Sequence, residues 1–168
     1  MLIAPFPSDE PQRLDCLRQL QVLDTPADPV LDGLVQCASV VTGCPIALVS
    51  LIDTDRQWFK ARHGFDMEQT PRERAFCTHA LLRDRLFEVP DAHADLRFAD
   101  NPLVLGAPHI RFYAGVPLEV DGHKLGTLCV IDREPRRLTA AQRTSLQGLT
   151  SAVEHWLLSH RQKIAVAE

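Results

Sequence analysis

The stretch IRFYAGVPLEVDGHKLGTLCVID, residues 110–132, carries the strongest signal for the fold. Residues 110–120 and 124–131 are patterned as strands. Asp121-Gly122 between them is a typical two-residue hairpin turn. The stretch therefore predicts two neighbouring antiparallel strands.

Three further strands are predicted upstream of this hairpin. CPIALVSLID, residues 44–53, is apolar on both faces and rich in β-branched residues, which is typical of a central strand. QWFKAR, residues 57–62, is its predicted hairpin partner, and residues 86–89 form a short strand. A polar loop is expected at 63–74, and mostly irregular chain with a helical turn or two at 90–109.

Helices are predicted at residues 11–23, 28–43, 76–84 and 139–160. Asp28 is a favoured N-cap before Pro29, and Gly43 ends that helix. Residues 139–142, TAAQ, match a capping box for the last helix. Because short turns join neighbouring strands, the sheet should be antiparallel and the fold class α+β, with helices flanking the sheet.

The bulk composition limits the function classes. The length of 168 residues favours one domain at 11–160, between an N-terminal arm at 1–10 and a C-terminal tail at 161–168. A net charge of -4 gives no electrostatic case for nucleic acid or membrane partners. Without a signal peptide or a spanning apolar run, the expected location is the cytoplasm. Five cysteines without a CxxC pair predict neither a disulfide framework nor a zinc ribbon.

More than four fifths of the chain, from about Arg13 to Val153, resembles the GAF domain family. The resemblance is carried by RLDCLRQLQVLDTP (13–26), PIALVSLIDTDRQWFKARHG (45–64), TPRERAFCTHAL (70–81), DLRFADNPLV (95–104), the stretch at 110–132 and the closing helix. It implies a six-stranded antiparallel sheet with N- and C-terminal helices on one face. Short helices and loops would form a small-molecule pocket on the other face. It also implies a sensory role, although one fold hosts many functions.

The sequence can be compared with the motifs of three functional classes within the family. The Asn-Lys-Phe…Asp-Glu signature of cyclic-nucleotide binders is missing. Bilin-binding members attach the pigment at a cysteine followed by histidine, whereas Cys77 is followed by threonine and His109 has no cysteine beside it. Free methionine sulfoxide reductase uses a nucleophilic and a resolving cysteine. Here the next cysteine after Cys77 is Cys129, inside a predicted strand.

The stretch RERAFCTHAL, residues 72–81, places a thiol, Cys77, and an imidazole, His79, two residues apart. Two residues apart on a helix, their side chains point about 200° away from each other and form no dyad. The favoured interpretation is that Cys77 is a small residue buried in the core. A pocket-lining role and a reactive thiol, whose pKa Arg72 and Arg74 would lower, are the alternatives.

The remaining pocket candidates come from the loop at 90–109 and from the strand at 110–120. Asp91 is expected to organise that loop, and Arg97 either does the same or meets an anionic ligand group. Phe112 and Tyr113 point to opposite faces of their strand, and the sequence does not say which one faces the pocket. The full set of pocket candidates is Cys77, His79, Asp91, Arg97, Phe98, Phe112 and Tyr113. No metal ligands, catalytic residues or cofactor are assigned.

The last helix is the second candidate surface. Its apolar seam extends beyond what a sheet can cover, so its end is expected to meet the N-terminal helix or a second subunit. The resemblance implies a homodimer through the terminal helices, with Leu149, Val153, Trp156 and Leu157 as candidates. The favoured function is a non-catalytic sensory domain that binds a small molecule and signals through this dimer or through another protein. One alternative is a thiol redox enzyme or sensor centred on Cys77. Another is a protein-interaction module with a closed pocket, and a cavity of a few hundred Å³ would argue against it.

Overall fold

The computed structural model describes residues 1–167. Its strands are β1 (Ile46–Ile52), β2 (Arg56–His63), β3 (Gln69–Pro71), β4 (Phe87–Val89), β5 (Phe112–Val120) and β6 (His123–Asp132). They form one sheet in the order β3-β2-β1-β6-β5-β4, and every neighbouring pair is antiparallel. The predicted fold class and the predicted hairpin turn at Asp121-Gly122 are both confirmed.

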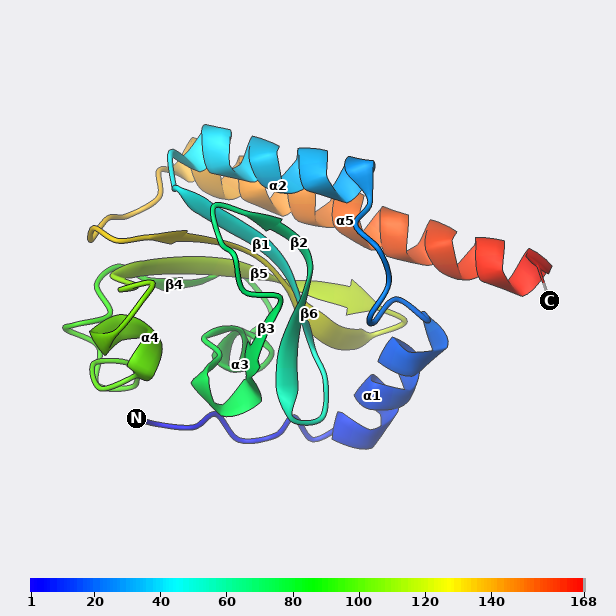
Figure 1. Ribbon diagram of the computed structural model, residues 1–168, viewed down its shortest axis with the longest axis horizontal. Helices are drawn as coiled ribbons and strands as arrows, with labels where there is room; N and C mark the ends of the chain where they lie inside the picture. The colour runs from blue at the N-terminus through cyan, green and yellow to red at the C-terminus, as the bar shows by residue number, and fades with distance from the viewer. Residues whose placement is uncertain (168) are drawn as a thin grey trace.

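Five α-helices surround the sheet: α1 (Glu10–Gln19), α2 (Pro29–Thr42), α3 (Cys77–Ala80), α4 (Pro102–Leu105) and α5 (Ala140–Ala167). Figure 1 shows α2 and α5 side by side on one face, while α3, α4 and the N-terminal residues lie on the other. The helix α1 packs near one end of the sheet against β6. None of the helices within residues 1–167 combines the length and the hydropathy needed to cross a bilayer.

The sheet separates two apolar cores. The helix-side core lies under α2 and α5, and the pocket-side core lies under α3, α4 and their loops. Strand β1 contributes to both, because Ala47, Val49 and Leu51 face the helices while Ile46 and Leu48 face the other way. All seven residues of β1 are buried, which confirms the prediction of a two-sided central strand.

The helix boundaries that depend on capping chemistry are confirmed. The Asp28 side chain accepts hydrogen bonds from the amides of Val30 and Leu31, at 2.9 and 3.3 Å. Gly43 ends α2 with a φ of 71°, a conformation that suits glycine. The Thr139 hydroxyl accepts from the Gln142 amide at 3.2 Å, and the Gln142 side chain accepts from the Thr139 amide at 2.9 Å.

Other boundaries differ from the predictions. The first helix ends at Gln19 and not at residue 23, because the chain turns at Gln21 with a φ of 48°. The expected loop at 63–74 contains β3, which pairs with Arg56–Trp58 of β2. The helix predicted at 76–84 is only one turn long. The helix α5 continues through Ala167, so residues 161–167 of the predicted tail are helical; residue 168 lies outside the described residues.

Candidate functional site

The pocket-side core encloses only a small cavity, of about 20 Å³. That is room for a single water molecule, whereas small-molecule sites usually measure about 300–1,000 Å³. The cavity lies between α3 and the sheet and is lined by Leu48, Gln57, Phe59, Phe65, Thr70, Phe76, Cys77, Leu103, Ile110, Tyr113, Cys129 and Ile131. The expected small-molecule pocket is therefore closed in this structure.

Aromatic side chains fill the space where a ligand would lie. Phe76 stacks on Phe98 with ring centroids 4.0 Å apart and planes inclined by 8°. Tyr113 lies 5.3 Å from Phe76. All three are almost fully buried, so a larger ligand requires α3 or the loop carrying Phe98 to move.

The sulfur of Cys77 is the meeting point of several polar groups at this cavity. The Tyr113 hydroxyl donates to it at 3.2 Å and the Thr127 hydroxyl at 3.1 Å. Burial raises the pKa of the Cys77 thiol, but the neighbouring polar side chains of Cys129, Thr127 and Tyr113 outweigh that effect and lower the pKa overall. The sequence suggested that Arg72 would lower the pKa of Cys77, but its guanidinium group instead donates to Glu10 and to the Asp53 carbonyl.

The position of Tyr113 depends on a glycine two residues further along β5. Residues two apart in a strand share a face, and the Tyr113 ring lies back over Gly115. A Cβ at Gly115 would come within 2.2 Å of the Tyr113 hydroxyl oxygen and 2.8 Å of its Cζ. The lack of a side chain at Gly115 therefore allows Tyr113 to reach Cys77.

Gly115→Ala is expected to displace the Tyr113 ring and to destabilise the protein by about 2 kcal/mol, a typical cost of overpacking. The free energy of unfolding in urea measures this loss. Because Tyr113 is the single tyrosine of the chain and burial raises its pKa well above the usual value, its phenolate absorbance should appear at lower pH in the variant. Gly33→Ala on α2, where nothing lies within 4 Å, is the control. An unchanged tyrosine titration would contradict this account.

His79 points away from Cys77, as the helical spacing predicts. Its Nε2 lies 3.1 Å from the Leu2 carbonyl oxygen, and its ring meets the edge of Phe98 at 4.8 Å. Burial lowers the pKa of His79, which favours the neutral ring and a hydrogen bond donated from Nε2 to Leu2. His79 thus attaches the N-terminal arm to α3.

The charged candidates of the loop at 90–109 are already paired. Asp91 accepts two hydrogen bonds from Arg111, at 2.9 and 3.0 Å. Asp95 accepts two from Arg97, at 2.9 and 2.6 Å. Arg97 is therefore neutralised within the chain and has the loop-organising role. Within residues 1–167, no three His, Cys, Asp or Glu side chains lie close enough together to hold a metal ion.

Phe112 does not belong to the pocket side. It is fully buried in the helix-side core, whereas its neighbour Tyr113 lies in the pocket-side core. On β5, Tyr113 therefore faces the pocket side and Phe112 faces the helices. The prediction of Phe112 as a pocket residue is wrong.

The candidates on α5 fall into two groups. Val153 and Leu157 have no exposed surface, because they pack into the helix-side core of their own chain. Leu149 and Trp156 are half-buried at the edge of that core. Trp156 stacks on His160 at 4.9 Å, and the Lys60 ammonium lies 5.4 Å from its ring centroid.

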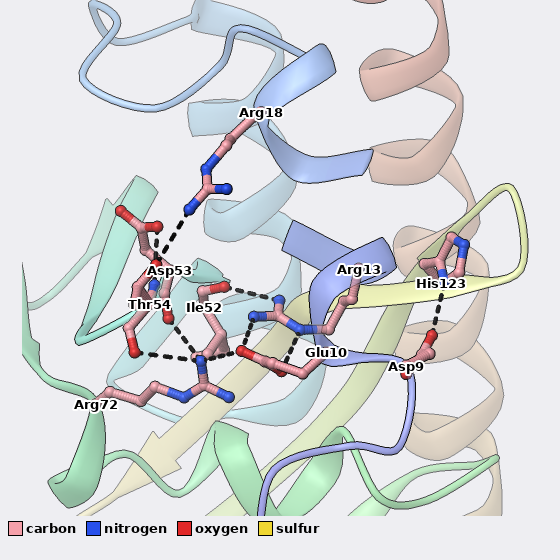
Figure 2. A network of polar contacts seen from close by, with 9 residues as sticks. All are labelled: Asp9, Glu10, Arg13, Arg18, Ile52, Asp53, Thr54, Arg72 and His123. Atoms are coloured by element: carbon pink, nitrogen blue, oxygen red, sulfur yellow. Dashed lines mark hydrogen bonds and ion pairs between the residues drawn. The ribbon is translucent and has the colours of Figure 1, made fainter. Parts of the chain in front are cut away.

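A buried ion network, not foreseen from the sequence, holds α1 to the sheet and to the segment before α3 (Figure 2). Arg13 has no exposed surface. It donates to Glu10 at 2.9 and 3.0 Å and to the Ile52 carbonyl at 2.7 Å. Arg72 donates to the same Glu10 carboxylate at 2.5 Å and to the Asp53 carbonyl at 2.8 Å. One carboxylate therefore serves two guanidinium groups from distant parts of the chain.

A groove of about 740 Å³ runs along β2 beside the loop between α1 and α2. Its most buried charge is Lys60, whose ammonium donates to the Thr25 hydroxyl at 2.7 Å and to the Pro26 carbonyl. Burial lowers the pKa of this lysine. Lys60 is thus used to hold the loop against β2.

Sequence reasoning did not select Gln57 and Cys129, which line the cavity. It also did not select Thr127, which donates to the Cys77 sulfur, or Gly115, which makes room for Tyr113. The only local signal was the Tyr-x-Gly spacing of Tyr113 and Gly115 on one strand face. The others come together through strand pairing, since Thr127 pairs with Ser50 and Cys129 pairs with Leu48 and Gly115.

Comparisons with known proteins agree with this fold. A relative from Pseudomonas aeruginosa named cyclic di-GMP phosphodiesterase is 50% identical over 137 residues, which are 81% of this chain. The chain spans only 23% of that relative's length. The GAF domain of a phosphoenolpyruvate-protein phosphotransferase from Coxiella burnetii superposes with a TM-score of 0.69 at 17% identity, covering 91% of this chain and 96% of the other. Free methionine-R-sulfoxide reductase from Neisseria meningitidis, solved with its substrate, superposes with a TM-score of 0.62 at 20% identity, covering 97% and 98%.

The two structural neighbours are similar in fold, and neither identity is high enough to carry a function across. The model of the GAF domain family matches residues 26–155 of this chain. That match includes the whole sheet, α2 to α4 and most of α5. The chain belongs to the GAF domain family.

Proposed function

We propose that this chain is a regulatory domain that transmits its signal through the outer surface of α2 and α5, called here the α2–α5 surface. The observation that carries the proposal is the apolar exposure of α2. Val30, Val40 and Val41 expose 59%, 76% and 41% of their surface. Val40 and Val41 are adjacent near the end of α2, and contiguous exposed apolar surface is typical of protein-binding sites.

The occupant we favour is a second copy of the chain. The helix α5 lies beside α2 and continues beyond it (Figure 1), so two copies can pair along both helices. Leu149 and Trp156, half-buried at the core's edge, would add contact area, while Val153 and Leu157 fix the position of α5 from within. A dimer of this kind can pass a change in one domain to an attached output. The relative named cyclic di-GMP phosphodiesterase supports an output of that class, in the same chain or in a separate signalling protein.

Val40→Glu is expected to weaken the dimer at least about tenfold, which corresponds to 1.4 kcal/mol. A charge at Val40 would have to lose water at the interface. Sedimentation velocity over a concentration series measures the dissociation constant. Leu105→Glu, on the opposite side of the sheet at the end of α4 and 66% exposed, should leave it unchanged. A wild-type chain that stays monomeric, or an equal effect of both variants, would contradict the proposal.

A small-molecule ligand is the second candidate, favoured by the polar groups on the cavity wall. The Ser50 hydroxyl donates to Gln57 at 2.7 Å, and the Gln57 amide donates to the Thr70 hydroxyl at 3.0 Å. A few buried polar groups on an apolar wall are typical of ligand sites. Native mass spectrometry of freshly purified protein distinguishes the candidates, because it reports both the subunit number and any bound mass.

The five free cysteines support a reducing compartment, the cytoplasm.

A further inference from the structure

We propose that Cys77 and Cys129 form a buried dithiol that hydrogen peroxide oxidises to a disulfide. The inference does not depend on the α2–α5 surface or on a dimer. It rests on the placement of two thiols, two hydroxyls and a cavity at one point in the pocket-side core.

The two sulfurs come from distant parts of the chain. Cys77 is the first residue of α3, and Cys129 lies in β6 beneath it. Both side chains line the same cavity of about 20 Å³, and the Cys77 sulfur accepts a hydrogen bond from Thr127, which lies two residues from Cys129 on the same face of β6. The two thiols therefore face the same small space, which suits a very small neutral molecule better than a bulky one.

The surroundings of Cys77 differ from those of the other buried thiols. Burial raises the pKa of Cys16 and of Cys44. Cys77 instead accepts hydrogen bonds from Tyr113 and Thr127, and these groups favour the thiolate. Because the thiolate is the nucleophile, Cys77 should attack an oxidant first, and Cys129 should follow as the resolving thiol.

The chemistry balances in two steps. The Cys77 thiolate attacks one oxygen of the peroxide, so that an S–O bond forms, the O–O bond breaks and hydroxide leaves to take up the thiol proton as water. The Cys129 sulfur then attacks the Cys77 sulfenic acid, an S–S bond forms, and water leaves with the Cys129 proton. In total, two thiols and one hydrogen peroxide give one disulfide and two waters. The product joins α3 to the central part of the sheet.

Mass spectrometry on the full chain tests the proposal. The Cys37→Ser variant is used because Cys37 is exposed and would react by itself. After treatment with hydrogen peroxide, we expect a loss of two hydrogen masses and a linked peptide pair containing Cys77 and Cys129. In Cys129→Ser, the Cys77 peptide should instead gain the mass of one or more oxygen atoms, because the resolving thiol is missing. A Cys77 that stays reduced while Cys16 or Cys44 oxidises would overturn the proposal.

Thr127→Val provides a second test that keeps both thiols. If the loss of this donor raises the pKa of Cys77 by one unit, the thiolate fraction and the oxidation rate should fall about tenfold at a pH well below that pKa. Urea unfolding of the variant confirms that it is folded. Thr150→Val is the matched control, since its buried hydroxyl donates to the Leu146 carbonyl within α5 at 2.8 Å. An oxidation rate unchanged in Thr127→Val, or slowed equally in Thr150→Val, would overturn the role given to the hydroxyls.

Discussion

Replacing Glu10 with alanine is expected to destabilise the protein by about 3 kcal/mol, because breaking a buried ion pair leaves an uncompensated charge. The Glu10 carboxylate contacts both Arg13 and Arg72. Arg13 has no exposed surface, so water cannot replace the lost partner. Its remaining contact with the Ile52 carbonyl satisfies one donor but leaves the charge unpaired.

The variant also weakens a junction between three segments. Figure 2 shows Glu10 and Arg13 on α1, Ile52 at the end of β1, and Arg72 in the 3₁₀ turn before α3. Urea unfolding measures the change in the free energy of unfolding. Asp15→Ala is the control on the same helix, because Asp15 lies 3.8 Å from Arg18 with both side chains mostly exposed. Exposed pairs contribute about 0–1 kcal/mol, so equal losses in the two variants would contradict the account.

The same network predicts a pH dependence. Burial alone would raise the pKa of Glu10, but the hydrogen bonds from Arg13 and Arg72 lower it overall. A carboxyl group with a lowered folded-state pKa stabilises the protein above its unfolded pKa. That contribution is lost as the pH falls through the folded value. The stability difference between the wild type and Glu10→Gln should therefore shrink in acid, as urea midpoints over a pH series can measure. A difference that grows in acid would contradict the assigned direction.

Gly126→Ala is the second substitution with a large expected effect, a loss of about 3 kcal/mol. A Cβ at Gly126 in β6 would lie 1.8 Å from the Ser50 carbonyl oxygen and 2.9 Å from the Leu51 Cα. Both atoms belong to the backbone of the central strand β1, which is held by β2 on its other side. The clash therefore requires two strands to separate.

Gly148→Ala is the matched control for Gly126→Ala. Gly148 lies in α5, and a Cβ there would meet nothing within 4 Å. Since glycine inside a helix is less favourable than alanine, this variant should be more stable by about 0.5–1 kcal/mol. Thermal unfolding of both variants measures the contrast. A Gly126→Ala protein as stable as the wild type would show that β1 and β6 can move apart at low cost.

The parts of the fold that local chemistry specifies were predictable from the sequence. Capping residues fix three helix ends to within a few residues. Asp28 followed by Pro29 marks the start of α2, Gly43 marks its end, and the capping box at Thr139 marks the start of α5. The first helix was predicted too long, because Leu20 and Val22 remain buried after the chain has left the helix. The strand β3 was missed because a three-residue edge strand has too few residues for an alternating pattern.

The candidate site was less predictable, because it depends on contacts between distant residues. The spacing of Cys77 and His79 correctly predicted that they face different neighbours. The sequence could not assign the faces of Phe112 and Tyr113, since both are large and buried. It also could not bring Cys129 to Cys77, because only the pairing of β6 within the sheet places that thiol under α3.

The length of α5 has a mechanical consequence. From Leu157, the last fully buried side chain of the helix, ten residues lead to Ala167, or about 15 Å at 1.5 Å per residue. Because this helical segment extends beyond the core, a tilt of about 10° at Leu157 would move its far end by about 2.6 Å. Arg161, partway along this segment, pairs with Asp121 in the turn between β5 and β6. This ion pair connects the hairpin to the C-terminal part of α5, so a shift of the hairpin would act on the helix beyond Leu157.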